Sequence, residues 1–299
     1  MLHNNQDKFK EIIRSVQAKT GFRDIFLEKD YYLTLLLSKI NIFNNDLVFK
    51  GGTCFNKIYF PYYRLSEDLD FTMKLPSNNI TRGMRSRAMK PIKENIEKYL
   101  ENIGLKLDKD KEPGRNENKQ YVFMINYDSI FMGTKGTIKL EVGLRFNPLL
   151  KTENRNVVHC FTNQITNESL FSGGEVNCLS LKESVAEKLR AAAGREMIAP
   201  RDFYDLDYLI RNKFNISDPE VLKLFELKTK EESTWDGMPK YCHNLGRSDK
   251  EIDDMRSRIE SELYPVIKLE EREKFNIDIA LARINKAFDV VKIKKTLKK

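Results

Sequence analysis

The spacing of apolar residues predicts that the chain begins with two helices. Apolar side chains recur at helical spacing at Phe9, Ile12, Ile13 and Val16. They would share one face of an amphipathic helix over residues 5–18, which we expect to end near Gly21. Residues 24–40 are richer in apolar side chains and predict a second helix, half-buried against a sheet.

The middle of the chain shows patterns that are typical of strands. Strands are predicted over residues 47–49, 119–127, 136–145, 157–160 and 176–179. The second and third of these are separated by a short glycine-containing turn, which predicts an antiparallel hairpin. Within residues 136–145, apolar Ile138, Leu140 and Val142 alternate with Lys139, Glu141 and Gly143. Glu141 is therefore expected on the polar face of its strand.

Helical patterns occupy the remainder. Residues 80–103 predict a helix with a break or a new start at Pro91. A capping-box signature at Ser180–Glu183 opens a helix that ends near Gly194, and Pro200 suits the first turn of the next. Further helical segments are predicted over residues 219–232, 248–262 and 277–299. We therefore expect an α+β domain over residues 1–180 and a helical C-terminal domain over residues 181–299.

Composition narrows the class of protein. The 299 residues are 40% hydrophobic, which supports a folded core, and carry a formal charge of +8, which favours polyanionic partners. No apolar run reaches the length of a membrane span, so no membrane association is expected. Cysteines without paired spacing stand at positions 54, 160, 178 and 242. This scatter predicts neither a zinc cluster nor a disulfide framework, and we expect a cytoplasmic protein.

Two short motifs carry the candidate chemistry. Gly51, Gly52 and Thr53 follow a buried strand, and a glycine turn at this place lets backbone N–H groups approach a phosphate. Asp68 and Asp70 are two positions apart, so on a strand both would project from the same face. Carboxylate oxygens are the ligands that Mg²⁺ prefers, and bound phosphates complete its shell. The alternative is that these aspartates are only the solvated face of an edge strand.

Together these motifs resemble the nucleotidyltransferase superfamily, in the version found in AbiEii/MenT toxins of type IV toxin–antitoxin systems. The resemblance rests on the segments LEKDYY (27–32), FKGGT (49–53), RLSEDLDF (64–71) and AEKLRAAAGREMIAPRDFYDLDYL (186–209). Residues 212–299 contain no matching motif. Thr53 stands where the superfamily most often has Ser, and the spacing from the glycine turn to the aspartates is longer than usual.

The resemblance implies a nucleotidyltransferase-like mixed sheet flanked by helices, and a Mg²⁺-dependent enzyme that would also accept Mn²⁺. The implied reaction transfers a nucleoside monophosphate from a nucleoside triphosphate to a tRNA 3′ end and stops growth. A cognate antitoxin that acts without a stable complex is implied as well. The implied catalytic residues are Asp68, Asp70, Glu141, Lys188 and Asp205, of which the first two and Glu141 would bind the metal. Glu141 is also a candidate base. The expected nucleotide-binding residues are Gly51, Gly52, Thr53, Ser66, Lys182 and Arg201.

Simpler readings remain for several of these residues. Glu141 could be an exposed strand residue, and Lys188 with Arg201 and Asp202 a helix-terminal ion network. Lys29 is expected to form an ion pair within its helix or with another helix at the domain surface. A basic segment contains Arg82, Arg85, Arg87 and Lys90. It is a candidate contact for a nucleic-acid backbone, and the alternative is a solvated helix face. For the whole chain, the alternatives are transfer to a protein or small-molecule hydroxyl, and a nucleic-acid or nucleotide binding module without catalysis.

Overall fold

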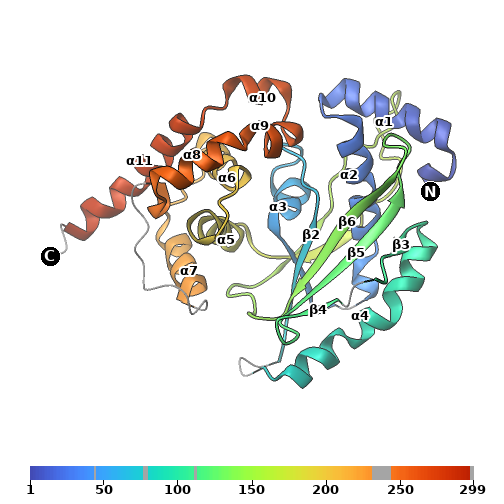
Figure 1. Ribbon diagram of the computed structural model, residues 1–299, viewed down its shortest axis with the longest axis horizontal. Coiled ribbons are helices and arrows are strands. Elements are labelled where there is room, and N and C mark those ends of the chain that lie inside the picture. Colours follow the sequence, from blue (N-terminus) through green and yellow to red (C-terminus); the bar gives the residue numbers. More distant parts are fainter. Residues whose placement is uncertain (44, 77–79, 111–112, 231–243, 297–299) are drawn as a thin grey trace. The chain divides into compact units, whose positions relative to one another are not determined.

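A computed structural model describes residues 1–299 except 44, 77–79, 111–112, 231–243 and 297–299 (Figure 1). The chain divides into two units, Met1–Ser180 and Leu181–Lys299, each with its own core. The first unit combines helices with a sheet, and the described residues of the second unit form helices and connections without a strand. No described helix is both long enough and apolar enough to cross a membrane.

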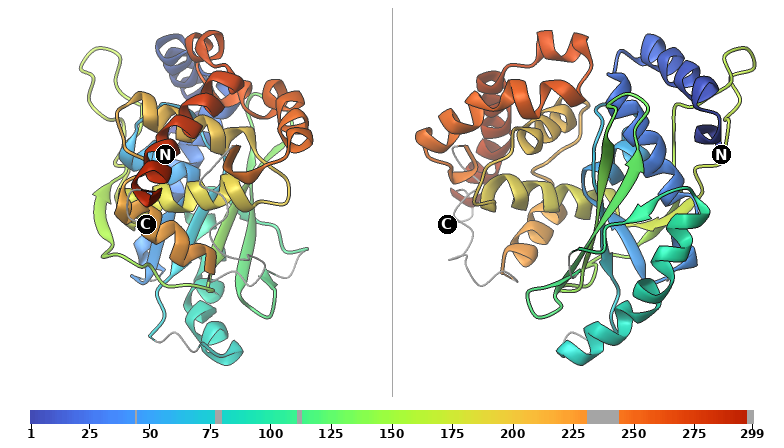
Figure 2. Two further views of the ribbon diagram at one scale, coloured as in Figure 1. Left: turned by 90° about the vertical axis from the view of Figure 1, so that its left-hand side faces the viewer. Right: turned by 45° about the vertical axis from the view of Figure 1, so that its right-hand side comes forward.

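A mixed sheet forms the centre of the first unit (Figure 1, Figure 2). Its strands are β1 Leu47–Lys50, β2 Leu69–Met73, β3 Lys106–Leu107, β4 Gly114–Arg115, β5 Gln120–Asp128, β6 Lys135–Gly143, β7 Glu153–Asn156 and β8 Glu175–Cys178. They follow the order β3-β5-β6-β2-β1-β8-β7, and β4 pairs with β5. β2 runs parallel to β6 and antiparallel to β1, so the predicted α+β class with a mixed sheet is confirmed.

The β5–β6 hairpin shows why the alternating pattern was informative. The two strands pair antiparallel from Gln120 opposite Gly143 to Asp128 opposite Lys135, as predicted. In β6 the apolar residues Ile138, Leu140 and Val142 are buried, while the polar residues between them are only partly covered. This hairpin therefore fixes which face of the sheet carries polar side chains.

Helices cover the sheet of the first unit. They are η1 Leu2–Asn4, α1 Gln6–Thr20, α2 Asp24–Leu37, η2 Ile40–Ile42, α3 Gly51–Cys54, the π-helix η3 Phe55–Tyr59 and α4 Arg82–Asn102. The Asn5 side chain accepts a hydrogen bond from Lys8 N and begins α1, and Gly21 at φ 75° ends it. α4 packs against α2, where the Tyr99 hydroxyl donates to Leu36 O at 2.7 Å.

Two predicted features of this unit are wrong. α4 runs without interruption through Pro91, because the buried residues Met89, Ile92 and Ile96 form one stripe whose packing outweighs a lost backbone hydrogen bond. The strand expected at residues 157–160 lies instead at Glu153–Asn156. β7 is an edge strand with mostly exposed polar side chains, so its sequence lacks the apolar alternation that marks a half-buried strand.

The second unit is a set of helices joined by short connections. Its helices are α5 Leu181–Gly194, α6 Pro200–Arg211, α7 Pro219–Lys230, η4 Asn244–Gly246, α8 Asp249–Ser257, α9 Ile259–Glu262, η5 Tyr264–Val266, α10 Leu269–Lys274 and α11 Ile277–Thr296. The helical segments predicted here are confirmed where they are described. Residues 231–232 and 297–299 of those segments, and Cys242, lie outside the described residues.

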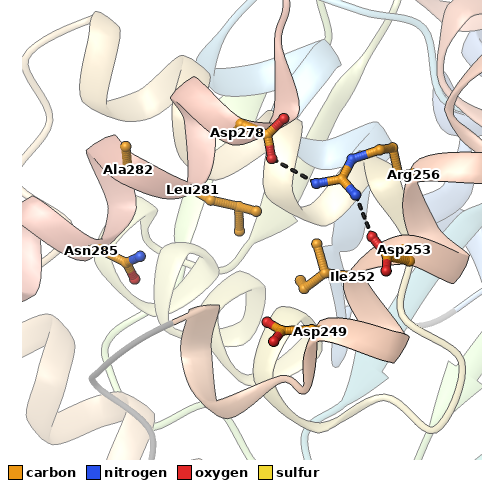
Figure 3. Close-up of a pocket in the computed structure, with 8 residues that line it drawn as sticks. All are labelled: Asp249, Ile252, Asp253, Arg256, Asp278, Leu281, Ala282 and Asn285. Atoms are coloured by element: carbon orange, nitrogen blue, oxygen red, sulfur yellow. Dashed lines mark hydrogen bonds and ion pairs between the residues drawn. The ribbon is translucent and has the colours of Figure 1, made fainter.

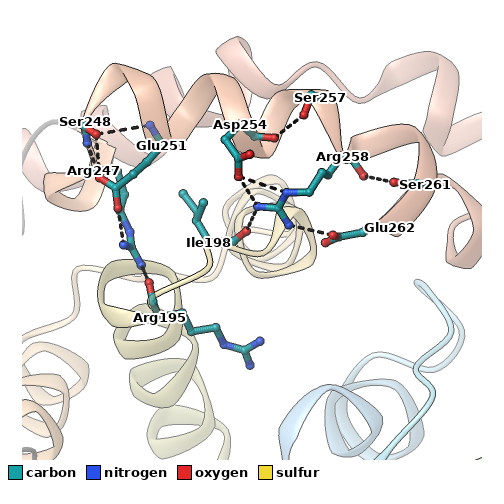
Figure 4. Close-up of polar contacts among 10 residues, drawn as sticks. All are labelled: Arg195, Ile198, Arg247, Ser248, Glu251, Asp254, Ser257, Arg258, Ser261 and Glu262. Carbon is teal, nitrogen blue, oxygen red and sulfur yellow. Dashed lines mark hydrogen bonds and ion pairs between the residues drawn. The ribbon is translucent and has the colours of Figure 1, made fainter.

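Two arginines tie the α5–α6 connection to the helices that follow η4 (Figure 4). Arg258 donates to Ile198 O at 2.6 Å and contacts the carboxylates of Asp254 and Glu262. Arg247 donates to Arg195 O at 2.6 Å and pairs with Glu251. Each arginine donates a charge-assisted hydrogen bond to a backbone carbonyl of this segment. These bonds fix the end of α5 and the start of α6.

Candidate active site

A row of charged residues crosses three adjacent strands of the first unit. Lys50 of β1 lies opposite Asp70 of β2, and Asp70 lies opposite Glu141 of β6. Residues paired across a sheet project from the same face, so these three side chains share one face. Asp68 lies two residues before Asp70, just ahead of β2, and its side chain is 44% exposed. The structure therefore brings the three predicted carboxylates to one region of the sheet.

Lys139 lies among these carboxylates. Its Nζ atom is 3.4 Å from Glu141 Oε2 and 3.7 Å from Asp68 Oδ2. Burial by itself would lower the pKa of Lys139, but Asp68, Asp70 and Glu141 together raise it above its ordinary value. The ammonium group is therefore held in its charged form between Glu141 of β6 and Asp68, which lies just ahead of β2.

Asp70 has the most perturbed carboxyl group of the row. Burial raises its pKa to about 6, with smaller raising contributions from Glu141 and Asp68, while Lys50 and Lys139 oppose the shift. The Asp70 carboxylate is buried because it lies against Gly51, whose backbone has φ 78°. A methyl group on Gly51 would lie 2.4 Å from Asp70 Oδ2, so the carboxylate packs directly against the glycine backbone. Only glycine fits this close approach.

The glycine turn is also tied to the segment that precedes β2. The Thr53 hydroxyl donates a hydrogen bond to Asp68 O, and Thr53 is buried. A methyl group on Gly52 would lie 2.8 Å from Arg64 Nη2 and 2.9 Å from Ser66 Oγ, so both side chains border this glycine. The predicted residues Gly51, Gly52, Thr53 and Ser66 thus lie together, with the Thr53 hydroxyl proton already used inside the protein.

A buried ion pair supports the helix that follows the glycine turn. Lys57 Nζ of η3 lies 2.6 Å from Asp30 Oδ2 of α2, and both side chains are fully buried. The Tyr62 hydroxyl donates to the same aspartate oxygen at 2.7 Å. The neighbouring Lys29 pairs with Glu67 at 3.4 Å, so it does form an ion pair, but the partner lies in the segment before β2 and not on a helix as expected. Of the adjacent residues Lys29 and Asp30, the second is therefore the one that anchors the core.

The predicted residues of the second unit form their own network. Lys188 Nζ of α5 lies 2.6 Å from Asp205 Oδ2 and 3.0 Å from Asp202 Oδ1 of α6, and all three side chains are buried. Arg195 Nε lies 3.3 Å from the other oxygen of Asp202. Both carboxylates contact the Lys188 ammonium, and the spacing of one helical turn between Asp202 and Asp205 makes this possible.

Lys182 and Arg201 are placed differently. Lys182 Nζ lies 2.6 Å from Glu220 Oε2 and 3.7 Å from Asp218 Oδ1, at the start of α7, and its side chain is 43% exposed. Arg201 is partly buried in the first turn of α6, next to Asp202. The predicted residues therefore fall into two groups, one in each unit of the chain.

The donor atoms of the carboxylate row suit a hard divalent cation. Mg²⁺ takes oxygen ligands, and one or two protein carboxylates suffice when phosphates and waters complete the shell. The Lys139 ammonium shows that the row already accommodates positive charge. Within the part of the chain that the structure describes, no three His, Cys, Asp or Glu side chains converge as a finished metal-binding group. The row fits the cation in chemistry and charge, while its carboxylates are not yet gathered around one point.

The basic segment after β2 needs a correction. Arg85 of α4 is only 7% exposed, and its guanidinium donates to Ile80 O and Glu117 O. It is a structural residue that holds the start of α4, so it does not belong to a nucleic-acid surface. Arg82 and Arg87 are exposed, and Lys90 pairs with Glu94 at 3.7 Å.

A cavity in the second unit contains none of the predicted site residues. It measures about 390 Å³ and lies between α8 and α11 (Figure 3). Arg256 crosses it and contacts Asp253 and, at 2.7 Å, Asp278. The Arg256 guanidinium is already matched by these carboxylates, and no other observation indicates a ligand.

The fold and the first group of residues define a class of protein. A mixed sheet flanked by helices, with a glycine turn packed against an aspartate strand and a third carboxylate in register, is the arrangement expected of a nucleotidyltransferase. The model of the family described as "Nucleotidyl transferase AbiEii toxin, Type IV TA system" matches residues 35–290. The chain belongs to this family, and it is a nucleotidyltransferase.

Two solved structures from Helicobacter pylori share the fold. One, described as a candidate nucleotidyltransferase, has a TM-score of 0.53 at 16% sequence identity and covers 93% of this chain and 99% of its own. The other, JHP933, has a TM-score of 0.52 at 16% identity, with coverages of 93% and 97%. At this identity the two structures support the fold alone. No curated protein sequence matches the chain.

Sequence reasoning did not single out two residues of the row. Lys139 stands two positions before Glu141, so the alternation in β6 already placed both on one face, but their ion pairs depend on the position of Asp68. Lys50 shares the row because β1 and β2 pair in a register that the sequence does not show.

Proposed function

We propose that the protein uses Mg²⁺, or Mn²⁺ in its place, to transfer a nucleoside monophosphate from a nucleoside triphosphate to the 3′ end of a tRNA. The row of Asp68, Asp70 and Glu141 beside the glycine turn carries this proposal. Membership of a type IV toxin family favours an outcome in which modified tRNA stops translation and growth. We further propose that the protein acts in the cytoplasm, against an antitoxin that forms no stable complex with it.

In the first unit, some residues would bind the triphosphate and the metal, and Glu141 would also contact the acceptor hydroxyl. Backbone N–H groups of Gly51, Gly52 and Thr53, with the Ser66 hydroxyl, would hold the triphosphate. Asp68, Asp70 and Glu141 would hold the divalent cation, which supplies charge stabilisation to the α-phosphoryl group and the departing pyrophosphate. The Glu141 side chain is 27% exposed, so an acceptor hydroxyl can reach it and transfer its proton to the carboxylate.

The reaction balances without a further reactant. The acceptor 3′-oxygen forms a bond to the α-phosphorus, the bond between the α-phosphorus and the bridging oxygen breaks, and pyrophosphate leaves. The proton of the acceptor hydroxyl passes to Glu141. Each substrate thus has a place at the carboxylate row, the triphosphate on the glycine turn and the acceptor beside Glu141.

For the second unit, we propose that Lys188 and Asp205 contact the nucleotide and that Lys182 and Arg201 assist. The support is chemical. Lys188 is a buried cation with two aspartates at 2.6 and 3.0 Å, so its position is fixed by strong hydrogen bonds. Lys182 and Arg201 are only partly covered, which leaves part of each side chain accessible to a polyanion.

Label transfer provides the test. Purified protein is incubated with each α-³²P nucleoside triphosphate and bulk tRNA, with Mg²⁺ or with a chelator. We expect label in tRNA only with the metal, and a loss of about 10²-fold or more in rate for Asp68→Asn and for Asp70→Asn, because an amide keeps the shape but not the charge. Both variants should unfold cooperatively, which shows that the loss is chemical.

Other outcomes identify the alternatives. Label in a protein or a small molecule would retain the nucleotidyl transfer and replace the acceptor. Binding of tRNA that depends on salt but not on metal, without any label transfer, would indicate a binding module. Transfer by Asp68→Asn or Asp70→Asn at the parental rate would show that the carboxylate row is not the active site.

A further inference from the structure

We propose that Lys139 is a built-in counter-ion of the carboxylate row, which a divalent cation must displace in order to bind. The inference rests on the proposed metal site and concerns what this chain does when the metal is absent. It assigns to Lys139 the role of a positioning residue, one that sets the arrangement of the carboxylates and the affinity for the metal.

The contacts of Lys139 support this role. Its ammonium group lies 3.7 Å from Asp68 Oδ2, just ahead of β2, and 3.4 Å from Glu141 Oε2 of β6. Asp70 lies in the same row, in register with Glu141. The Lys139 ammonium thus contacts two of the three carboxylates, while the second lysine of the row, Lys50, lies opposite Asp70.

The charges explain why a counter-ion is useful. Three carboxylates on one face repel one another, and Asp70 is packed against Gly51, where water cannot screen it fully. Lys139 offsets this repulsion in the metal-free protein. A lysine is suited to the task because its ammonium is a compact charge on a flexible stem that can move away without disturbing the strand.

The same arrangement opposes metal binding. A divalent cation would need the carboxylate oxygens that Lys139 contacts, and two cations between the same oxygens repel each other. The Lys139 ammonium contacts one carboxylate oxygen of Asp68 and one of Glu141. Metal entry therefore requires the ammonium to leave and the carboxylates to rearrange.

Mn²⁺ binding without nucleotide is the direct test. Free Mn²⁺ is measured by electron paramagnetic resonance against the parent, Lys139→Met and Lys139→Gln. We expect both variants to bind Mn²⁺ about three- to tenfold more tightly than the parent, because each loses the competing charge and keeps a side chain of similar length. Lys139→Arg retains the charge and should bind Mn²⁺ no more tightly than the parent.

Lys135→Met is a matched control. Lys135 begins the same strand and is exposed, so this variant loses the same charge from β6 at a distance from the carboxylates. Its Mn²⁺ affinity should equal that of the parent. A second measurement avoids activity altogether: Mg²⁺ should raise the unfolding temperature of Lys139→Met by more than it raises that of the parent or of Lys135→Met.

The outcomes separate this inference from the proposed function. Parental Mn²⁺ binding that Asp68→Asn abolishes, together with equal or weaker binding by Lys139→Met and Lys139→Gln, would overturn the role of Lys139 alone. Equal tightening in Lys135→Met would also overturn it, because a general charge effect would then suffice. Absence of Mn²⁺ binding in the parent and in every variant would overturn the metal site, and this inference with it.

Discussion

At the residue scale, Asp70 is the carboxyl group of the row whose pKa its surroundings shift. Its carboxylate packs against the Gly51 backbone and shares a row with Glu141, so its pKa rises to about 6. In the unfolded chain the pKa returns to its ordinary value, 3.8. The folded state therefore binds this proton more tightly, and ionisation of Asp70 at neutral pH costs stability.

Asp70→Asn should stabilise the metal-free protein at neutral pH. The shift from 3.8 to about 6 corresponds to about 1 to 3 kcal/mol, present above pH 6 and lost as pH falls toward 4, where the parental Asp70 is also neutral. Chemical unfolding in the presence of a chelator, at several pH values between 5 and 8, measures the difference between variant and parent. A difference that does not change over this range would contradict the assignment.

Gly51→Ala should disturb both the backbone and the carboxylate. Gly51 has φ 78°, and an added methyl group would meet Asp70 Oδ2 at 2.4 Å. We expect a loss of about 2 to 3 kcal/mol in the free energy of unfolding, together with a loss of label transfer of at least about tenfold.

Gly133→Ala provides the control for this substitution. Gly133 has φ 65°, but nothing lies within 4 Å of an added methyl group. The free energy of unfolding of Gly133→Ala should fall by about 1 kcal/mol, because alanine is disfavoured in the left-handed backbone conformation, and its activity should be retained. Equal losses of activity in the two variants would show that contact with Asp70 is unimportant.

At the element scale, the glycine turn depends on the helix that follows it. Lys57 of η3 and Asp30 of α2 form an ion pair of 2.6 Å that excludes water, and Tyr62 donates to the same carboxylate. A buried ion pair adds little net stability, but removal of one member leaves an uncompensated charge. The pair therefore fixes how η3 lies against α2, and with it the turn at Gly51.

Lys57→Met should lower the free energy of unfolding by about 3 to 5 kcal/mol, because Asp30 would remain buried without its cation. Lys29→Met provides the control, because it removes a lysine from α2, the helix of Asp30. Lys29 lies 3.4 Å from its partner Glu67, and the Glu67 side chain is partly exposed. This control should lose at most about 1 kcal/mol. Unfolding in guanidinium, followed by circular dichroism, measures the free energy of unfolding of both variants. A loss below about 1 kcal/mol for Lys57→Met would mean that another group compensates the charge of Asp30.

At the scale of the whole molecule, the charge of +8 favours a polyanionic partner but does not locate its binding surface. The structure removes Arg85 from the candidate surface, because its guanidinium is used by backbone carbonyls. Arg82 and Arg87 remain exposed at the start of α4 and are the residues to test.

A variant with Arg82 and Arg87 replaced by Ala should bind tRNA more weakly at low salt. The slope of log K against log salt should become shallower by about 0.7 to 0.9 for each lost phosphate contact. Lys8 and Lys19 on α1 are also exposed, so their replacement by Ala removes the same charge elsewhere and should leave the slope unchanged. Equal tRNA binding by both double variants and the parent would place the acceptor surface elsewhere.

The sequence by itself determined the type of most elements and predicted the residues of the carboxylate row. Alternating polarity placed Glu141 on the polar face of β6, whereas Asp68, expected on one strand with Asp70, lies just ahead of β2. Helical periodicity was equally informative for α1 and for the second unit. Such patterns are local, because the periods of helices and strands repeat within a few residues. They do not require knowledge of which segments meet.

Only the tertiary structure decided which charged residues are partners. The register of β1, β2 and β6 places Lys50, Asp70 and Glu141 in one row, and the fold brings Lys139 to Asp68. Arg85, expected at the surface, is buried and has a structural role. α4 continues through Pro91 because its buried residues pack as one stripe. Each of these results depends on contacts between segments far apart in the chain, and neither pairing register nor burial of a charge is encoded in a short local pattern.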